Sequence, residues 1–142
     1  MRTLAPSNVK AVDLDGTLAN DAVISMTDYR SDVIGNPIQQ MVNRVKAWLD
    51  RGDKVVIFTA RVHPKHGLAE VAIAEKAIKE WCLKVFGIEL EVTCMKDPMF
   101  NEIWDDKGVR VVQDTGEVSS QQDVDDPLVH SDTDAIGSFF DL

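Results

Sequence analysis

With 142 residues, the chain is long enough for one domain with a sizeable hydrophobic core, and no apolar run approaches the roughly 20 residues that span a bilayer. Hydrophobic residues at 44% and charged residues at 27% are ordinary for a globular protein, and the net charge of −9 argues against strong nucleic-acid binding. The first six residues lack the apolar core of a signal peptide. We therefore expect a soluble, cytoplasmic protein without a membrane partner.

The negative charge is concentrated at the C-terminus. Residues 1–116 carry all 15 Lys and Arg residues against 17 Asp and Glu, whereas residues 117–142 carry seven acidic residues and no basic one. We therefore expect one domain at 1–116 and an acidic, flexible tail at 117–142. The ending Phe139-Phe140-Asp141-Leu142 could dock on a protein partner as a hydrophobic-acidic peptide.

Apolar periodicity predicts strands that alternate with helices. The expected strands are 9–14, 55–58, 91–95, 103–104 and 109–112. The expected helices are 38–51 and 68–86, and the expected loops are 18–37 and 62–67. Such an alternation is typical of an open, mostly parallel α/β sheet. Cys82 and Cys94 lie in apolar surroundings without metal-ligand spacing, which predicts reduced core thiols.

Charged and polar side chains follow four of these strands. Asp13 and Asp15 lie two residues apart at the end of the first strand and so share one face, and Gly16-Thr17 forms a turn directly after them. Ligands of open parallel sheets bind beyond the carboxyl ends of the strands. The further candidates at this edge are Thr59, Arg61, Lys96, Asp105 and Asp106.

These residue types predict a phosphoryl-transfer site with a metal ion. Neighbouring carboxylates repel each other unless a proton or cation lies between them, and Mg²⁺ prefers oxygen ligands. A carboxylate can also attack phosphorus to form an aspartyl-phosphate, while a second acid exchanges protons with the leaving group and with water. A lysine can balance the charge of the transferred group.

Four stretches of the chain resemble, in the same order, the four motifs of the haloacid dehalogenase (HAD) superfamily of phosphatases, and the resemblance extends over residues 9–112. The stretches are Val12-Asp13-Leu14-Asp15-Gly16-Thr17, Phe58-Thr59-Ala60-Arg61, Lys96 and Asp105-Asp106. The resemblance implies a Rossmann-like sheet, with Asp13 as nucleophile and Asp15 as general acid and base. It implies that Thr59 and Lys96 contact the phosphoryl group. Mg²⁺ would be held by Asp13, the backbone carbonyl of Asp15 and Asp105, with Asp106 either as a further ligand or as a residue that orients the ligands.

Two features of the chain depart from many members of this superfamily. Only eight residues separate Lys96 from Asp105, where a helix is usual, so that Lys107 and Lys65 are alternatives for the lysine. Residues 18–37 are too few for a cap domain, which predicts an open site. An open site suits a polynucleotide end, or a small substrate if a homo-oligomer supplies the lid.

The Thr59-Ala60-Arg61 string and the helix around Trp81 also resemble the phosphatase half of phage polynucleotide kinase-phosphatases and small uncapped phage phosphatases. We expect a Mg²⁺-dependent phosphomonoesterase that acts on a nucleotide or another small phosphorylated metabolite. The alternatives are a polynucleotide 3′-phosphatase and a non-catalytic phosphate- or metal-binding regulatory module, such as a receiver-like domain or a degenerate relative that binds a partner through its tail.

Several residues also have a purely structural interpretation. Arg61 could contact a substrate phosphate or base, or could be a solvated arginine. His63 and His66 are expected to be solvated rather than metal ligands, because no third ligand is near them in the sequence. The three tryptophans are expected in the core: Trp48, Trp81 and Trp104.

Overall fold

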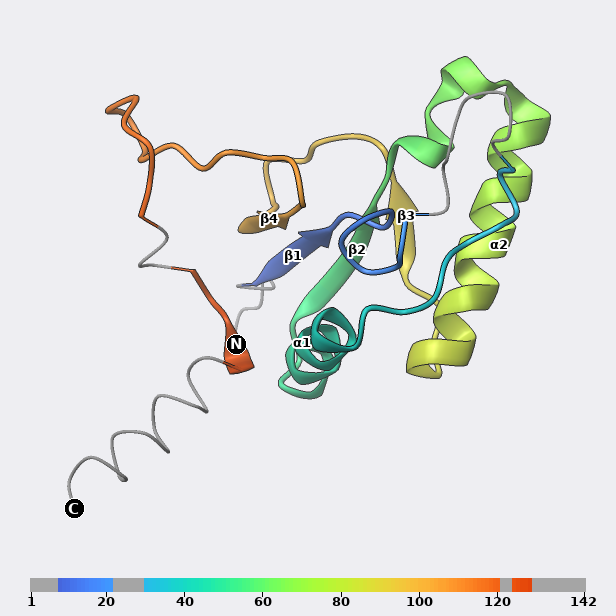
Figure 1. Cartoon of the computed structure of the whole chain (residues 1–142), viewed down its shortest axis with the longest axis horizontal. Coiled ribbons are helices and arrows are strands. Elements are labelled where there is room, and N and C mark those ends of the chain that lie inside the picture. The colour runs from blue at the N-terminus through green and yellow to red at the C-terminus, as the bar shows by residue number, and fades with distance from the viewer. Residues whose placement is uncertain (1–7, 22–29, 121–123, 129–142) are drawn as a thin grey trace, which may run out of the picture. The chain divides into compact units, whose positions relative to one another are not determined.

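The computed structural model describes residues 8–21, 30–120 and 124–128 (Figure 1). The chain divides into two compact units, Met1–Asp106 and Lys107–Leu142. The elements of the first unit, in chain order, are β1 (Val9–Val12), α1 (Gln39–Asp50), β2 (Lys54–Phe58), the 3₁₀ turns η1 (Ala60–Val62) and η2 (Pro64–His66), α2 (Leu68–Phe86), β3 (Glu91–Thr93) and β4 (Glu102–Trp104).

The four strands form one open, all-parallel sheet in the order β3-β2-β1-β4. The first strand of the chain is therefore central, with Val12 opposite Ile57 of β2 on one side and opposite Trp104 of β4 on the other. The predicted parallel α/β sheet is confirmed. Because all strands run in the same direction, their carboxyl ends lie at one edge of the sheet.

Both helices pack on the same face of this sheet. Alternate residues of β2, Val55 and Ile57, lie in one hydrophobic core with Val12 and with buried side chains of both helices. These are Met41, Val42, Val45 and Trp48 of α1 and Ala74, Ile78 and Cys82 of α2. The helical spacing of these residues explains why the sequence predicted both helices. Cys82 and Cys94 are free thiols.

The connection from β3 to β4 crosses the other face of the sheet without a helix. Phe100 stacks edge-on against Phe58, with ring centroids 5.5 Å apart, and Phe58 points away from the face that holds Ile57. The Asn101 N–H then donates to the Val9 carbonyl (2.9 Å), which brings the chain back to the start of β1. Eight residues are thus enough to connect the two strands.

A lysine is buried at the amino end of the sheet. Lys10 is 1% exposed, and its ammonium lies 4.0 Å from the Asp53 carboxylate and 5.7 Å from the centre of the Trp48 ring. The pairing with a carboxylate and an aromatic face explains how a charged residue can occupy a central strand.

The prediction of a strand at 109–112 is wrong. In the second unit this segment has a single antiparallel bridge, Val111 to Val118, supported by the bond from the Val112 N–H to the Glu117 carbonyl (2.7 Å). A run of valines favours extended backbone, but it becomes a strand only where a sheet offers a partner. The ending Phe139–Leu142 and residues 22–29 of the expected loop 18–37 lie outside the described residues. Within the described part of the chain, no helix has the length and apolarity needed to cross a membrane.

Candidate active site

A tight turn directly after β1 positions the first two acidic residues. The Leu14 carbonyl accepts hydrogen bonds from the backbone N–H groups of Thr17, Leu18 and Ala19, and Gly16 lies in the left-handed region at φ 86°. The Asp13 N–H donates to the Trp104 carbonyl (2.8 Å), which extends the pairing of β1 with β4. This bond brings Asp13 next to the residues that follow β4.

Three carboxylates meet at this edge of the sheet. Asp13, Asp105 and Asp106 each offer one oxygen, and these oxygens all lie within 4.8 Å of one another. The Thr17 hydroxyl is 3.3 Å from Oδ2 of Asp13 and 3.2 Å from Oδ1 of Asp106 and donates toward both. Two stretches about 90 residues apart in the sequence thus form one acidic cluster.

Burial and the neighbouring carboxylates shift the pKa of Asp13 in this acidic cluster. Burial, the charge of Asp105, and hydrogen bonding and repulsion with Asp106 together raise the pKa of Asp13 to about 7, against the opposing effect of the Leu14 N–H. For Asp106, desolvation is the largest single effect and acts upward, but hydrogen bonds from its own N–H and with Asp13, Thr17 and Asp105 together hold its pKa below the ordinary value. A proton on Asp13 thus relieves the repulsion when no cation is bound.

We expect the metal-free protein to lose stability as the pH rises from 5 to 8. In the folded protein Asp13 has a pKa of about 7 and so keeps its proton up to about that pH, whereas in the unfolded chain its pKa is near 3.8. The folded state therefore binds more protons in this window, and the free energy of unfolding falls with pH. Urea unfolding in EDTA at both pH values measures the effect. Asp13→Asn should flatten the dependence, and an equally steep dependence in that variant would contradict the assignment to Asp13.

Asp15 faces a different partner from Asp13. Arg61 of η1 donates from Nε to Oδ2 and from Nη2 to Oδ1 of Asp15, both at 2.8 Å. The Arg61 residue is 4% exposed, so it is not a solvated surface arginine. The two acids of the first motif are therefore held in different ways, Asp13 among carboxylates and Asp15 by a guanidinium.

Thr59 lies at the end of β2, directly before η1. Its hydroxyl oxygen accepts the Arg61 N–H (3.2 Å) and so caps the 3₁₀ turn, and the residue is 3% exposed. Its hydroxyl hydrogen remains a possible donor to a phosphoryl oxygen. The predicted substrate contact of Thr59 stays a prediction.

The structure places Lys96 after β3, at the outer edge of the sheet. β2 lies between β3 and β1, so the β3 axis is about 10 Å from β1 at the usual strand spacing. Lys96 is exposed and has no hydrogen bond or ion pair within the described residues. Of the alternatives, Lys65 lies in the exposed turn η2 and Lys107 belongs to the second unit.

Gly16 and Thr17 were not among the predicted site residues, although both directly follow Asp13 and Asp15 in the first motif. A Cβ atom on Gly16 would lie 2.7 Å from Oδ2 of Asp106, so only glycine lets that carboxylate approach the turn. Thr17 connects the same carboxylate to Asp13. The sequence signal that could have identified Thr17 is its position, because it places a hydroxyl four residues after Asp13 in the turn that follows the strand.

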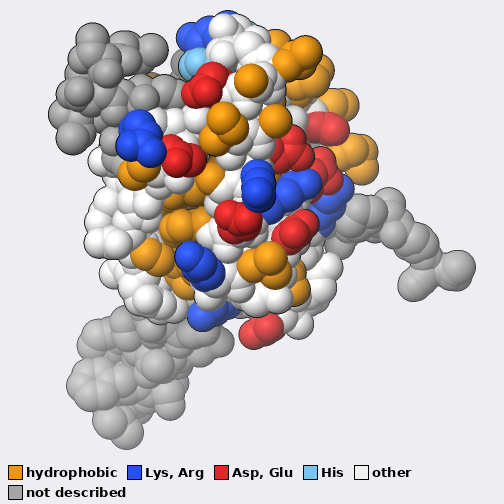
Figure 2. Space-filling model, turned by 90° about the vertical axis from the view of Figure 1, so that its right-hand side faces the viewer, with side chains coloured by type: hydrophobic (Ala, Val, Ile, Leu, Met, Phe, Trp, Pro, Cys, Tyr) orange, Lys and Arg blue, Asp and Glu red, His pale blue; other side chains and the backbone are white. Residues whose placement is uncertain are grey.

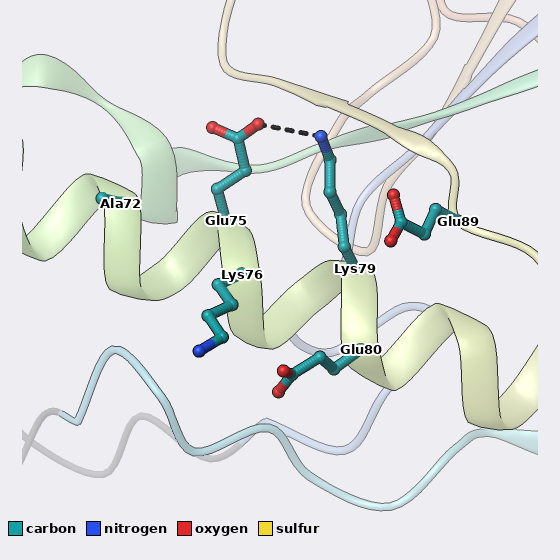
Figure 3. A pocket seen from close by; sticks show the side chains of 6 residues that line it. All are labelled: Ala72, Glu75, Lys76, Lys79, Glu80 and Glu89. Carbon is teal, nitrogen blue, oxygen red and sulfur yellow. Dashed lines mark ion pairs between the residues drawn. The ribbon is translucent and has the colours of Figure 1, made fainter.

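A shallow groove of about 480 Å³ lies elsewhere, along α2 (Figure 3). Its lining is mostly charged and includes an ion pair between Lys79 and Glu75 (3.1 Å), with Glu89 contributed by the segment after the helix. Figure 2 shows that Lys and Arg side chains intermix with Asp and Glu on the side of the molecule where α2 lies. This face offers no single charge sign to a partner.

No protein-family model and no curated protein matches the chain. Among solved structures, it is similar to that of a conserved protein from Bacteroides thetaiotaomicron, with a TM-score of 0.48 and 22% sequence identity over 71% of this chain and 77% of the other. A likeness at this level specifies neither the fold family nor the activity of the chain.

Proposed function

We propose that this protein is a Mg²⁺-dependent phosphomonoesterase of the HAD type, which works through an aspartyl-phosphate. The observation that carries the proposal is the convergence of Asp13, Asp105 and Asp106 within 4.8 Å, with Asp15 on the same turn. These acids come from the carboxyl ends of β1 and β4, where open parallel sheets bind their ligands.

The acidic cluster fits a small divalent cation. In octahedral coordination at about 2.1 Å, two ligand oxygens are about 3 Å apart in adjacent positions and about 4.2 Å apart in opposite ones. The three carboxylate oxygens lie within 4.8 Å of one another, so rotation of the side chains has to close a difference of up to about 1.8 Å to reach the adjacent spacing. Asp13, Asp105 and Asp106 would hold the ion, with the Asp15 carbonyl as a further ligand. The ion would neutralise the acids and offset the charge of the phosphoryl group.

The residues of the chain would then carry out two displacements. An Asp13 oxygen attacks phosphorus while the bond to the leaving oxygen breaks, and Asp15 supplies a proton to that oxygen. Water next attacks phosphorus and passes a proton to Asp15, and the Asp13 carboxylate leaves with its electron pair. Thr59 and a lysine, Lys96 or one of its alternatives, would contact the phosphoryl oxygens.

A nucleotide or another small phosphorylated metabolite is the preferred substrate class. The 1–116 region is nearly neutral, and the α2 face mixes both charge signs, whereas a long polynucleotide requires clustered cations (Figure 2). The polynucleotide 3′-phosphatase remains the second candidate.

Release of inorganic phosphate from p-nitrophenyl phosphate, nucleoside monophosphates, sugar phosphates and a 3′-phosphorylated oligonucleotide tests the proposal. We expect saturable turnover that EDTA abolishes and added Mg²⁺ restores. Mg²⁺ binding without phosphate release from any of these compounds would support the non-catalytic module instead.

A further inference from the structure

We propose that Arg61 is a positioning residue. It holds the Asp15 carboxylate in the orientation in which Asp15 accepts a proton from the water that attacks the aspartyl-phosphate. This inference rests on the function proposed above. It assigns Arg61 a role through Asp15 and not through contact with the substrate. The central observation is the pair of parallel 2.8 Å hydrogen bonds from Nε and Nη2 to the two oxygens of Asp15.

The bidentate contact fixes the plane of the Asp15 carboxylate. Asp15 lies in the turn between Leu14 and Gly16, with its side chain 19% exposed, and a carboxylate there would otherwise rotate about two side-chain bonds. Two coplanar N–H donors match an ionised carboxylate. The ionised form is the one that accepts a proton from water.

Arg61 is itself held from several directions. Its backbone N–H donates to the Thr59 hydroxyl (3.2 Å), and Nη1 donates to the carbonyls of Ser31 (3.2 Å) and Arg30 (3.3 Å). The Ser31 hydroxyl donates in turn to Glu70 of α2 (2.9 Å). With 3% of its side chain exposed, Arg61 offers almost no surface to a phosphate oxygen.

The orientation of Asp15 matters most in the second displacement. The water oxygen forms a bond to phosphorus while one water proton passes to Asp15. The bond between phosphorus and the Asp13 oxygen breaks, and its electron pair returns to the Asp13 carboxylate. Inorganic phosphate leaves, and Asp15 keeps the proton for the next leaving oxygen or, where the leaving group needs none, releases it to solvent. With p-nitrophenyl phosphate the first displacement needs no proton, because p-nitrophenolate leaves as an anion.

Arg61→Lys tests the proposal in stopped-flow assays of the full chain with p-nitrophenyl phosphate and Mg²⁺. Lysine keeps the charge but loses the planar pair of donors. We expect kcat to fall by about 10- to 100-fold, the range that a misplaced catalytic group costs. KM should fall with kcat, and a burst of about one p-nitrophenolate per site should appear, because the aspartyl-phosphate accumulates.

The matched control is Arg51→Lys, since Arg51 also pairs with an aspartate (Asp53, 2.7 Å), at the opposite edge of the sheet. It should leave kcat and KM unchanged. In an Asp15→Asn background, Arg61→Lys should cause no further loss, because Arg61 acts through Asp15. A raised KM without a burst in Arg61→Lys would show that Arg61 binds the substrate. Additive losses of kcat in the double variant would show that Arg61 has a structural role independent of Asp15. Either result overturns the proposal.

If Arg61→Lys fails to fold, Asp15→Glu repeats the test, because one added methylene displaces the carboxylate from Arg61 without removing its charge. The same burst supports the proposal, and its absence overturns it. A wild-type protein without turnover would refute the proposed function and this inference together. Wild-type turnover without a burst in the folded variants would refute only the role of Arg61.

Discussion

Asp13→Asn should abolish the release of phosphate from p-nitrophenyl phosphate in the presence of Mg²⁺. Asparagine keeps the shape of the side chain but is a poor nucleophile and removes one anionic metal ligand. We expect kcat to fall by at least about 1,000-fold, since removal of a catalytic nucleophile can cost on the order of 10⁶-fold. Initial rates over a range of Mg²⁺ concentrations measure the loss and separate it from weaker metal binding.

Asp50→Asn is the matched control for this substitution. Asp50 is an exposed aspartate at the end of α1, at the amino end of β2 and away from the acidic cluster. It should leave turnover unchanged. If Asp13→Asn retained turnover at saturating Mg²⁺, Asp13 could not be the nucleophile, and the proposed aspartyl-phosphate would have to form elsewhere or not at all.

Gly16→Ala should weaken Mg²⁺ binding by about tenfold or more, the range seen when the groups that orient metal ligands are altered. The added Cβ would lie 2.7 Å from Oδ2 and 3.0 Å from Cγ of Asp106, so that this carboxylate must leave its place beside Asp13. The left-handed backbone at φ 86° adds a stability cost of about 1–2 kcal/mol for any residue with a Cβ. The Mg²⁺-dependent rise of the unfolding temperature measures the binding.

Gly52→Ala separates the two effects of that substitution. Gly52 has a similar φ of 94°, but a Cβ there would have no atom within 4 Å. This variant should lose stability and keep its affinity for Mg²⁺. Equal Mg²⁺ affinity in Gly16→Ala and the wild type would show that Asp106 is not needed to hold the ion.

Hydrophobic spacing was enough to predict most of the fold. The buried stripe of α1 and the continuous apolar run of β2 have different periods, and each determined its element within one or two residues. Val109–Val112 had the composition of a strand and failed as a prediction, because pairing depends on which edge of a sheet is near. The sequence of these four residues does not contain the information on which strand they would pair with.

The site could be predicted only in part. The rule that ligands bind at the carboxyl ends of parallel strands suggested that Asp13 would meet Asp105 and Asp106, and the order β2-β1-β4 makes them neighbours. The pairing of Arg61 with Asp15 was not predictable in this way. It depends on side-chain conformations and on the hydrogen bonds of Arg61 to the Arg30 and Ser31 carbonyls, which no spacing in the sequence encodes.

The central position of β1 has a consequence for the order of folding. β1 can pair with β2 once about 60 residues are available, but its other edge waits for β4, whose Glu102 pairs with Lys10 about 90 positions earlier. Contacts of such long range form late, because the intervening chain must first be ordered. Asp13 therefore meets Asp105 and Asp106 only after the β4 segment has been synthesised and docked. On the ribosome, a nascent chain that ends before residue 102 can bury the α1 and β2 core, yet it carries only the first of the three acids.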